Sequence, residues 1–516
     1  MAKVMTAKEA VSLYVKDGAT IASSGFVGAS QPEELCIAIQ ESFLENNSPK
    51  DVTLLYAAGQ GGEGVKGLNH FGEEGLCRRV IGGHWGLMPR IQKLALEDKL
   101  EAYNFPQGVI AQLFREIAGG RVGLITHVGL NTFVDPRLEG GKINNRAKAA
   151  EDLVEMIEID GKERLFYKAM PVDVAIIRGS FADTQGNITS HREGVCVDVL
   201  AIAQAAKNSG GHVIVQVEKL VEHGTLDSRL VKIPGIYVDA VVVASRENHM
   251  QTIGSQYNPA YSGEARIPVD SLAPMPLNER KIIARRAAME LVPYSVTNLG
   301  IGMPEGIASV AAEEHIEGIV LTTEAGTIGG IPAGGGDFGV TTNADCVLEE
   351  PSQFDFYDGG GLDVAFLGLA QMDGEGNINV SKFGPKIAGC GGFINITQNS
   401  KKVVFCGTFT QGGLKVEVKD GELEIVQEGK NKKFIHQVEQ ITFSGEYAKK
   451  IRQPVLYITE RAVFELTEQG VELIEVAPGM NIEKDILAHI EFDVIVKQPK
   501  LMDERIFRSE KMGLIL

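Results

Sequence analysis

The sequence predicts an α/β fold with two tandem, related open domains built on mainly parallel sheets. Short apolar strands alternate with helical patterns, one segment of the first half recurs in the second, and glycine is abundant at 60 of 516 residues. A chain of this length exceeds what one hydrophobic core usually holds, so more than one domain is expected.

The first half of the chain alternates strand-like and helical segments. The expected strands are short and rich in Val and Ile: 20–22, 52–56, 122–126, 174–177, 213–215 and 241–243. The expected helices lie between them, at 32–43, 89–98, 109–118 and 197–207. In the first helix, Leu35, Ile39 and Phe43 recur every four residues and form an apolar stripe. This alternation indicates parallel sheets covered by helices.

A repeat relates the two halves. Residues 173–188 match residues 363–378 at seven of sixteen positions, with an offset of 190. Further upstream, residues 28–33 match residues 300–305 in the same order along the chain. One such match can arise by chance, but two in the same order indicate two copies of one α/β unit.

The two copies are separated by a stretch without periodicity. Residues 266–279 contain Pro268, Pro274 and Pro276 and predict an extended linker. We therefore expect an N-terminal domain at 1–265 and a C-terminal domain at 280–516.

One carboxylate stands out in the second copy. Glu324 follows a strand-like run at 318–323, and seven glycines fall within residues 326–339. A carboxylate beside such a glycine-rich stretch has the surroundings that a nucleophile or an acid–base group needs, because glycine lets a ligand approach closely. A solvated glutamate before a flexible loop is the simpler alternative. Aligning the copies places Ala57 opposite Glu324, so only one copy carries the carboxylate, and we expect a cleft between the domains.

Two other glycine motifs are candidates for ligand contact. Gly300 and Gly302 stand before Pro304, with a spacing that differs from a dinucleotide fingerprint but suits close approach to a phosphate-bearing ligand. Gly389, Gly391 and Gly392 surround Cys390 and could direct main-chain N–H groups at an oxyanion, or could simply clear space at a helix start.

Two further side chains were weighed for chemistry. Gln107, between Pro106 and Gly108, places an amide where a helix is expected to begin, although a plain helix start explains it equally well. Cys390 resembles a nucleophile only weakly, since no histidine lies near it in the sequence.

Composition excludes several classes of function. A net charge of −18 argues against nucleic acid or an anionic membrane as a partner. The ten histidines form no metal-binding motif, and the six cysteines show no CxxC spacing, so we expect no metal and reduced thiols. The sequence shows no leader or membrane span, and we expect a cytoplasmic location.

Taken together, these segments resemble the family I CoA-transferases, and more closely their propionate and short-chain acyl-CoA:acetate branch. The resemblance covers nearly all of residues 1–480. It rests on the motifs at 24–28 with 32–33, 106–108, 298–304, 323–330, 358–361 and 388–397. Ala325 departs from the Glu-Ser-Gly often found in this branch, and we assign no catalytic role to that position.

The resemblance implies a mechanism in which CoA is both substrate and covalent intermediate, without a tightly bound cofactor or a metal. Glu324 would attack an acyl-CoA thioester and then carry CoA as a glutamyl thioester, with Gly389 and Gln107 as further catalytic groups. The residues implied to bind CoA are Asn298, Gly300, Gly302, Gly389, Gly391 and Gly392. Lys382 and Lys386 are candidates for contacts to its phosphates.

The implied partners are acyl-CoA and short-chain carboxylic acids, and related proteins are commonly homo-oligomers, including tetramers. Acetate, propionate, butyrate, lactate and acetoacetate all remain open as acids. An acyl-CoA hydrolase using the same glutamate is the nearest alternative, and a non-catalytic ligand sensor is a second one from a different class.

Overall fold

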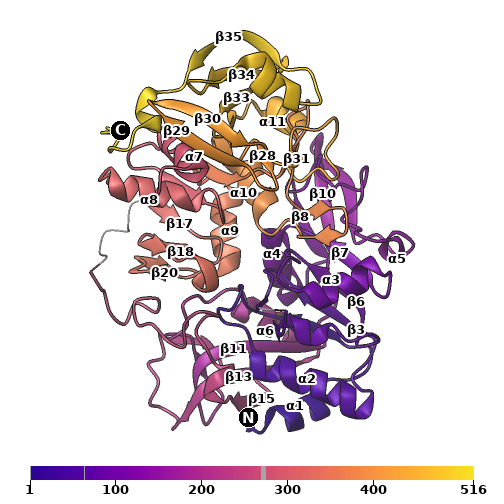
Figure 1. Cartoon of the computed structure of the whole chain (residues 1–516). Helices are drawn as coiled ribbons and strands as arrows, with labels where there is room; N and C mark the ends of the chain where they lie inside the picture. The colour runs from indigo at the N-terminus through magenta and orange to yellow at the C-terminus, as the bar shows by residue number, and fades with distance from the viewer. Residues whose placement is uncertain (1, 63, 269–274, 516) are drawn as a thin grey trace. The chain divides into compact units, whose positions relative to one another are not determined.

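The computed structural model describes residues 2–62, 64–268 and 275–515, which form two compact units (Figure 1). Unit 1 comprises residues 1–267, 323–355 and 383–395, and unit 2 comprises residues 268–322, 356–382 and 396–516. The linker expected at 266–279 includes residues 269–274, and with them Pro274, which lie outside the described residues.

A parallel sheet forms the centre of unit 1. Its strands, in spatial order, are β1 (Lys3–Val4), β15 (Ala240–Val243), β13 (His212–Val221), β11 (Val174–Asp183), β2 (Thr20–Ser23), β3 (Val52–Tyr56), β6 (Cys77–Gly82) and β7 (Glu101–Asn104). Each neighbouring pair along this path is parallel. The parallel sheet expected from the sequence is confirmed for this unit, and β6 and β7 extend it beyond the predicted strands.

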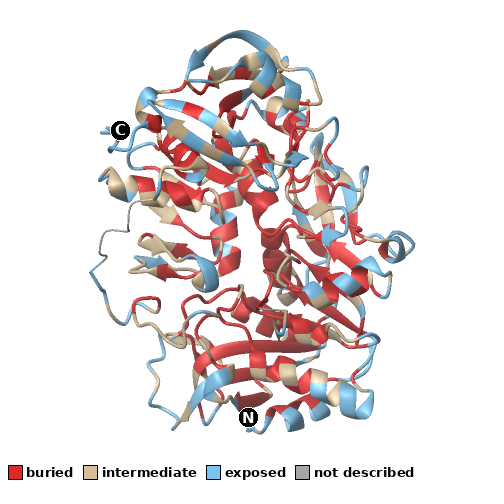
Figure 2. Ribbon diagram, in the orientation of Figure 1, coloured by how far each residue is buried: buried red, intermediate tan, exposed pale blue. Residues whose placement is uncertain are grey.

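Helices cover both faces of this sheet. On one face, α1 (Ala7–Tyr14), α2 (Glu33–Asn46) and α3 (Pro89–Leu96) contribute to one core cluster with the strands. On the other face, α6 (Val199–Asn208) packs against β11 and β13, and α4 (Gln107–Ala118) packs against α6. Figure 2 shows the strands buried, with exposed residues on the outer surfaces of α1 and α2, while α4 and α6 are largely buried. The unit is therefore a doubly wound α/β layer structure.

The strand predicted at 122–126 does not join the parallel sheet. It forms β8 (Gly123–Thr126), which pairs antiparallel with β10 (Lys162–Lys168), and β10 pairs antiparallel with β9 (Val154–Ile159). Val122 is 78% exposed, which does not fit a strand buried on both faces.

Two stretches of the expected C-terminal domain belong to unit 1. They include β18 (Thr327–Ile328), β19 (Ile331–Pro332), β20 (Thr341–Thr342), β21 (Cys346–Val347), β26 (Lys386–Ile387) and the first part of α9 (Glu350–Asp358). Main-chain hydrogen bonds hold them there. Trp85 N–H donates to the carbonyl of Ala388 at 2.7 Å, and Glu350 N–H donates to the carbonyl of Val197 at 2.9 Å.

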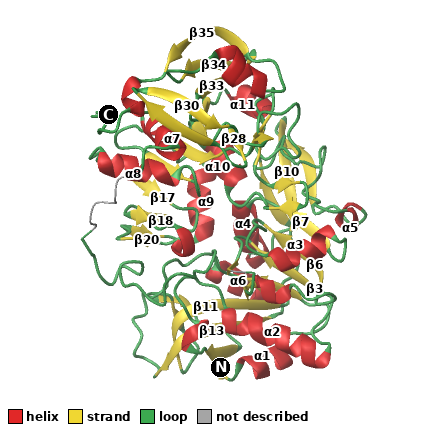
Figure 3. Cartoon of the chain, viewed as in Figure 1, coloured by secondary structure: helices red, strands yellow, loops and turns green. Residues whose placement is uncertain are grey.

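Unit 2 contains a second sheet (Figure 3). Its strands, in spatial order, are β17 (Val320–Thr322), β16 (Val296–Leu299), β22 (Val364–Gly368), β27 (Val403–Cys406), β32 (Val455–Ile458), β33 (Ala462–Thr467), β34 (Gly470–Val476) and β35 (Ile495–Leu501). The pairs from β17 to β32 along this path are parallel. The helices α7 (Glu279–Ala288) and α8 (Glu305–Glu313) share a core with this sheet.

The remaining elements are short, apart from one hairpin of β29 and β30. They are α5 (Asn145–Lys148), α10 (Phe393–Asn399), α11 (Gly445–Ile451), β4 (Gly61–Gly62), β5 (Lys66–Gly67), β12 (Ile188–Thr189), β14 (Val231–Ile233), β23 (Gln371–Met372), β24 (Ile378–Asn379), β25 (Lys382–Phe383), β28 (Thr410–Gln411), β29 (Lys415–Lys419), β30 (Glu422–Gln427) and β31 (Asn431–Lys432).

The sequence repeat is a structural repeat. The strand order β15-β13-β11-β2-β3 in unit 1 corresponds to β32-β27-β22-β16-β17 in unit 2. After β11, the Asp183 carboxylate accepts hydrogen bonds from the main chain and side chain of Asn187. After β22, Asp373 accepts the same bonds from Asn377. The glycine before each asparagine adopts a φ of +85° and +82°, a conformation that favours glycine.

Two observations concern the chain as a whole. Within the described ranges, no helix has both the length and the apolar character of a membrane span. All six cysteines are free thiols; Cys346 is exposed and the other five are buried.

Candidate functional site

A tight turn after β17 holds Glu324. Thr323 N–H donates to the carbonyl of Thr327 at 3.0 Å, and Gly326 N–H donates to the carbonyl of Thr323 at 3.1 Å. Gly326 has a φ of +108°, and a Cβ there would lie 2.2 Å from the carbonyl oxygen of Leu348, so the turn requires glycine. The glycine that follows Glu324 is therefore needed for the close main-chain packing that fixes the carboxylate.

The Glu324 carboxylate is partly buried and unpaired. Among the described residues, none donates a hydrogen bond to it or forms an ion pair with it. Burial raises the pKa of Glu324 to about 7, because desolvation disfavours the charged form. A solvated glutamate at a strand end would keep an ordinary pKa, so burial distinguishes Glu324 from the simpler alternative.

The motif around Cys390 is a turn in unit 1 with a left-handed main chain at two glycines. Gly389 and Gly391 have φ values of +78° and +52°. Gly391 N–H donates to the carbonyl of Gly83 at 2.8 Å, and Cys390 N–H donates to the side-chain oxygen of Asn104 at 2.9 Å. The N–H groups of Gly389 and Gly392 have no acceptor in the part of the chain that the structure describes. This glycine turn, residues 389–392, thus has two main-chain donors left for a ligand.

The glycine turn lies against Glu324. A Cβ placed on Gly392 would be 3.0 Å from Glu324 Oε2 and 3.2 Å from Phe354 Cζ. A Cβ on Gly389 would be 2.8 Å from the carbonyl oxygen of Gly83 and 2.9 Å from Trp85 N. Both positions therefore leave no room for a side chain, and the main chain approaches the carboxylate directly.

Gln107 joins the same group of residues. It is the first residue of α4, and its N–H donates to the carbonyl of Gly391 at 2.9 Å. Its side-chain nitrogen donates to Glu350 Oε1 at 2.6 Å, and its side-chain oxygen would be 3.7 Å from a Cβ on Gly391. The structure thus brings Glu324, Gln107 and the glycine turn together within unit 1.

Three predicted residues lie in unit 2. Asn298, near the end of β16, is buried and donates to the carbonyl of Thr322 at 3.3 Å, while its side-chain oxygen has no partner. Gly300 packs tightly, since a Cβ there would lie 3.0 Å from Leu367 Cδ2, whereas Gly302 has open space around its Cα. Their contribution to a ligand site stays a prediction.

Two side chains around the glycine turn, Asn104 and His84, were not predicted from the sequence. Asn104 holds the turn through Cys390, and its nitrogen also donates to the carbonyl of Gly82 at 2.7 Å. His84 packs near the turn, and burial, followed by the charge of Lys386, lowers the pKa of His84 to about 4, so the imidazole is neutral at pH 7. The available signal was polar residues at the carboxyl ends of β6 and β7, where ligands of parallel sheets usually bind.

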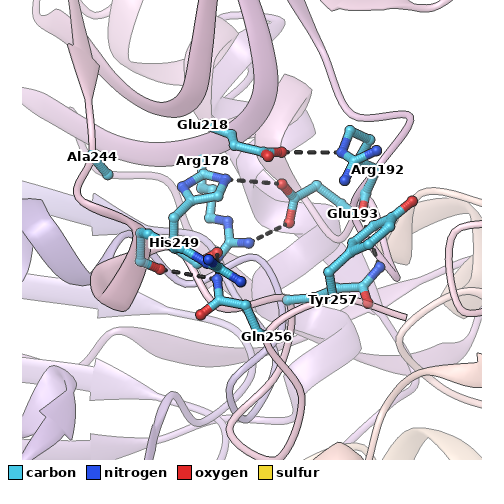
Figure 4. Close-up of a pocket in the computed structure, with 10 residues that line it drawn as sticks. Arg178, Arg192, Glu193, Glu218, Ala244, His249, Gln256 and Tyr257 are labelled. Carbon is cyan, nitrogen blue, oxygen red and sulfur yellow. Dashed lines mark hydrogen bonds and ion pairs between the residues drawn. The ribbon is translucent and has the colours of Figure 1, made fainter. Parts of the chain in front are cut away.

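A separate cavity of about 390 Å³ lies elsewhere in unit 1 (Figure 4). Arg178 pairs with Glu193 at 3.1 Å, and Arg192 pairs with Glu218 at 3.1 Å. Burial by itself would raise the pKa of Glu193, but the charges and hydrogen bonds of Arg178 and His249 together outweigh it and hold the pKa at about 2. None of the predicted site residues lines this cavity, and its Arg178 and Arg192 charges are compensated by these carboxylates.

The arrangement around Glu324 suits nucleophilic acyl transfer. The carboxylate supplies a nucleophile of raised basicity, and the free N–H groups of the glycine turn supply donors for an oxyanion. Among the described residues, no cluster of three or more His, Cys, Asp or Glu could hold a metal ion.

Comparison with known proteins agrees with this chemistry. The coenzyme A transferase family matches residues 4–244. The caffeate CoA-transferase of Acetobacterium woodii is 48% identical, covering 100% of this chain and 99% of that protein. The acetate CoA-transferase YdiF of Escherichia coli K12 is 44% identical, covering 99% of this chain and 96% of that protein.

Solved structures give the same result. The acyl-CoA transferase YdiF of Escherichia coli O157:H7, as an apoenzyme, superposes with a TM-score of 0.95 at 43% identity, covering 100% of this chain and 98% of that one. A thioester complex of YdiF with CoA superposes with a TM-score of 0.94, at the same identity and coverage. Since the similarity extends over the whole chain, this protein belongs to the coenzyme A transferase family.

Proposed function

We propose that the protein transfers CoA between short-chain acyl-CoA thioesters and free carboxylic acids, such as acetate and propionate, through a glutamyl-CoA thioester on Glu324. The observation that carries the proposal is the unpaired Glu324 carboxylate packed against Gly392, with a pKa raised to about 7 by burial. The whole-chain similarity to an acetate CoA-transferase and a caffeate CoA-transferase supports it.

The proposed reaction conserves the thioester. The ionised Glu324 attacks the acyl-CoA carbonyl, the C–S bond breaks, and an acyl-glutamyl anhydride and CoA thiolate form. The thiolate then attacks the Glu324 carbonyl carbon, which releases the first carboxylate and leaves CoA bound to Glu324. A second carboxylate reverses these two steps. Each step exchanges one acyl bond for another, so the reaction needs no ATP.

The other predicted residues take supporting roles in this proposal. The Gly389 N–H donates to the oxyanion of each tetrahedral intermediate, and one such donor is worth roughly 3–4 kcal/mol. Gln107 holds a reacting carboxylate. Asn298, Gly300, Gly302, Gly391 and Gly392 contact CoA, which is a substrate and a covalent intermediate rather than a resident cofactor.

Trapping the intermediate tests the proposal. The protein is incubated with acetyl-CoA, treated with borohydride or hydroxylamine, digested and analysed by mass spectrometry. We expect a mass change on the peptide carrying Glu324 in the wild type and in the variant Glu317→Gln, which alters an exposed glutamate seven residues earlier in the sequence. Glu324→Gln should show no trapped product, and an unmodified Glu324 peptide in the wild type would contradict the proposal.

A panel of acceptor acids then separates transfer from hydrolysis. Transfer requires that acetyl-CoA consumption depend on an added carboxylic acid and yield its CoA thioester. Release of free thiol without any acid would instead identify an acyl-CoA hydrolase using the same glutamate. Undiminished activity of Glu324→Ala would favour a site elsewhere.

The proposal also includes the oligomeric state of the protein and its location in the cell. We propose a homo-oligomer, with a tetramer as one form, acting in the cytoplasm. Light scattering of the purified protein measures the oligomeric state, and cell fractionation measures the cellular location.

A further inference from the structure

Unit 1 also buries the carboxyl groups of Glu350 and Asp198, and Glu350 is hydrogen-bonded to Gln107. Glu350 is fully buried, one of its oxygens accepts the Gln107 hydrogen bond of 2.6 Å, and its Oε2 has no partner. Asp198 is 2% exposed, and its Oδ1 also has no partner. The main chain brings them close, because Glu350 N–H donates to the carbonyl of Val197, the residue before Asp198.

The charged groups around this pair do not neutralise it. The negative charges of Asp198 and Glu324 act on Glu350, and that of Glu349 acts on Asp198. Lys232 lies 4.0 Å from Glu349 and pairs with that residue. Asp355, further along α9, is paired with Arg115. No described residue forms an ion pair with Asp198 or Glu350.

Two buried carboxyl groups in this position cannot both be ionised at neutral pH. Desolvation, and then the charge of Asp198, raises the pKa of Glu350 well above its usual range. Desolvation also raises the pKa of Asp198 to about 7. The pair therefore titrates as one unit.

The protonation of Glu350 matters for Gln107 because the nitrogen of the amide donates hydrogen bonds, whereas its oxygen accepts them. An ionised Glu350 only accepts, so it requires the amide nitrogen and leaves the amide oxygen facing the glycine turn, which is the arrangement in the structure. A protonated Glu350 can donate to the amide oxygen. The amide nitrogen then faces the turn as a donor.

We propose that Asp198 and Glu350 share one proton, and that this proton, acting through Glu350, sets which end of the Gln107 amide faces the glycine turn. The effect of this proton on activity rests on the proposed function, CoA transfer through Glu324. A carboxylate beside Glu324 is attracted by an amide N–H and repelled by an amide oxygen. Glu350 is thus a positioning residue for Gln107, and loss of the shared proton lowers activity.

The kinetic test is the pH dependence of kcat/KM for acetyl-CoA with acetate or propionate as acceptor. In the wild type, activity rises through pH 7 as Glu324 ionises, and falls about tenfold per pH unit above the pKa of the pair. Glu350→Gln should keep the acidic limb and lose the alkaline limb, whatever its absolute activity at pH 7. Asp198→Asn should shift the alkaline limb to lower pH, because it removes the neighbouring charge that favours protonation.

A matched control exists one turn further along both helices. The side chain of Gln112 donates to Asp355 at 3.1 Å, as Gln107 does to Glu350, but Asp355 is exposed and paired with Arg115. Asp355→Asn should leave both limbs in place. An unchanged alkaline limb in Glu350→Gln, or an equal loss of activity at every pH, would overturn the proposal.

Infrared spectroscopy tests the shared proton without using activity. At about pH 8.5, where Glu324 and Asp198 with pKa values of about 7 are mostly ionised, the wild type should show a carboxylic acid C=O band from a buried protonated group that is absent in Glu350→Gln and present in Asp355→Asn. The same band in the wild type and in Glu350→Gln would contradict the shared proton even if the enzyme is active. Conversely, the band can be present in a protein that transfers no CoA, so this result is independent of the proposed function.

Discussion

Asn104 accepts a hydrogen bond from Cys390 N–H at 2.9 Å and so ties the end of β7 to the glycine turn beside Glu324. Its side-chain nitrogen donates to the carbonyl of Gly82 at the end of β6. One side chain therefore connects two strand ends of the unit 1 sheet to the donors proposed for the oxyanion.

Asn104→Ala should lower kcat for CoA transfer by about 10- to 100-fold, because the turn loses the bond that orients the Gly389 N–H. The fold should lose about 1–3 kcal/mol, since Cys390 N–H is left buried without a partner. Steady-state kinetics and urea denaturation measure both effects. Asn145→Ala, which alters an exposed asparagine bonded to Asp98, is the control and should change neither. Wild-type kcat in Asn104→Ala would show that the turn does not depend on this bond.

Gly392→Ala should abolish most activity, because the added methyl group would lie 3.0 Å from Glu324 Oε2 and would displace the carboxylate. We expect a loss of more than 100-fold in kcat/KM. Gly368→Ala serves as the control, since nothing lies within 4 Å of a Cβ there, and it should retain full activity. A Gly392→Ala variant with normal kinetics would refute the close packing of the turn on Glu324.

Glu324→Gln should stabilise the fold at alkaline pH. The folded-state pKa of Glu324, about 7, lies above its ordinary value of 4.5, so the unfolded chain releases its proton first as the pH rises. The wild type thus loses stability between about pH 4.5 and 7, and remains less stable above that range. We expect no difference between the variant and the wild type near pH 4, and a gain of about 1–3 kcal/mol for Glu324→Gln at pH 8. Urea unfolding at the two pH values measures it, and an equal effect at both would contradict the burial argument.

Cys390→Ala should keep at least a third of wild-type activity. Burial raises the pKa of the Cys390 thiol far above its usual range, so it does not form the thiolate that nucleophilic catalysis needs. Iodoacetamide labelling of the native protein, read by mass spectrometry, should modify the exposed Cys346 and leave Cys390 unmodified. Complete inactivation of a folded Cys390→Ala protein would restore the thiol as a candidate.

The parts of the fold that the sequence predicts are those with strong local patterns. Strand β3 is mostly apolar and β11 begins with an apolar run at 174–177, and the apolar stripe of α2 places that helix on the sheet. Strands β6 and β7 lack such a pattern, because they carry Arg79 and Glu101, which pair with each other across the two strands at 2.5 Å. An ion pair between neighbouring strands cannot be read from either segment alone.

The site was predictable to the extent that glycine and carboxylate stand together in the sequence. Glu324 and the glycine turn were found this way. Glu350 and Asp198 were not, because each lies in a segment of ordinary composition and only the fold makes them neighbours. The membership of residues 323–355 in unit 1 likewise depends on main-chain bonds between loops, such as that of Glu350 with Val197, which have no sequence signature.

The division of the chain into two units limits when unit 1 can complete its folding during translation. The first 267 residues leave the ribosome without the two stretches, 323–355 and 383–395, that complete their unit. The Glu324 site consequently cannot assemble until translation has passed residue 395, and a nascent chain halted earlier exposes the unfilled surface to chaperones.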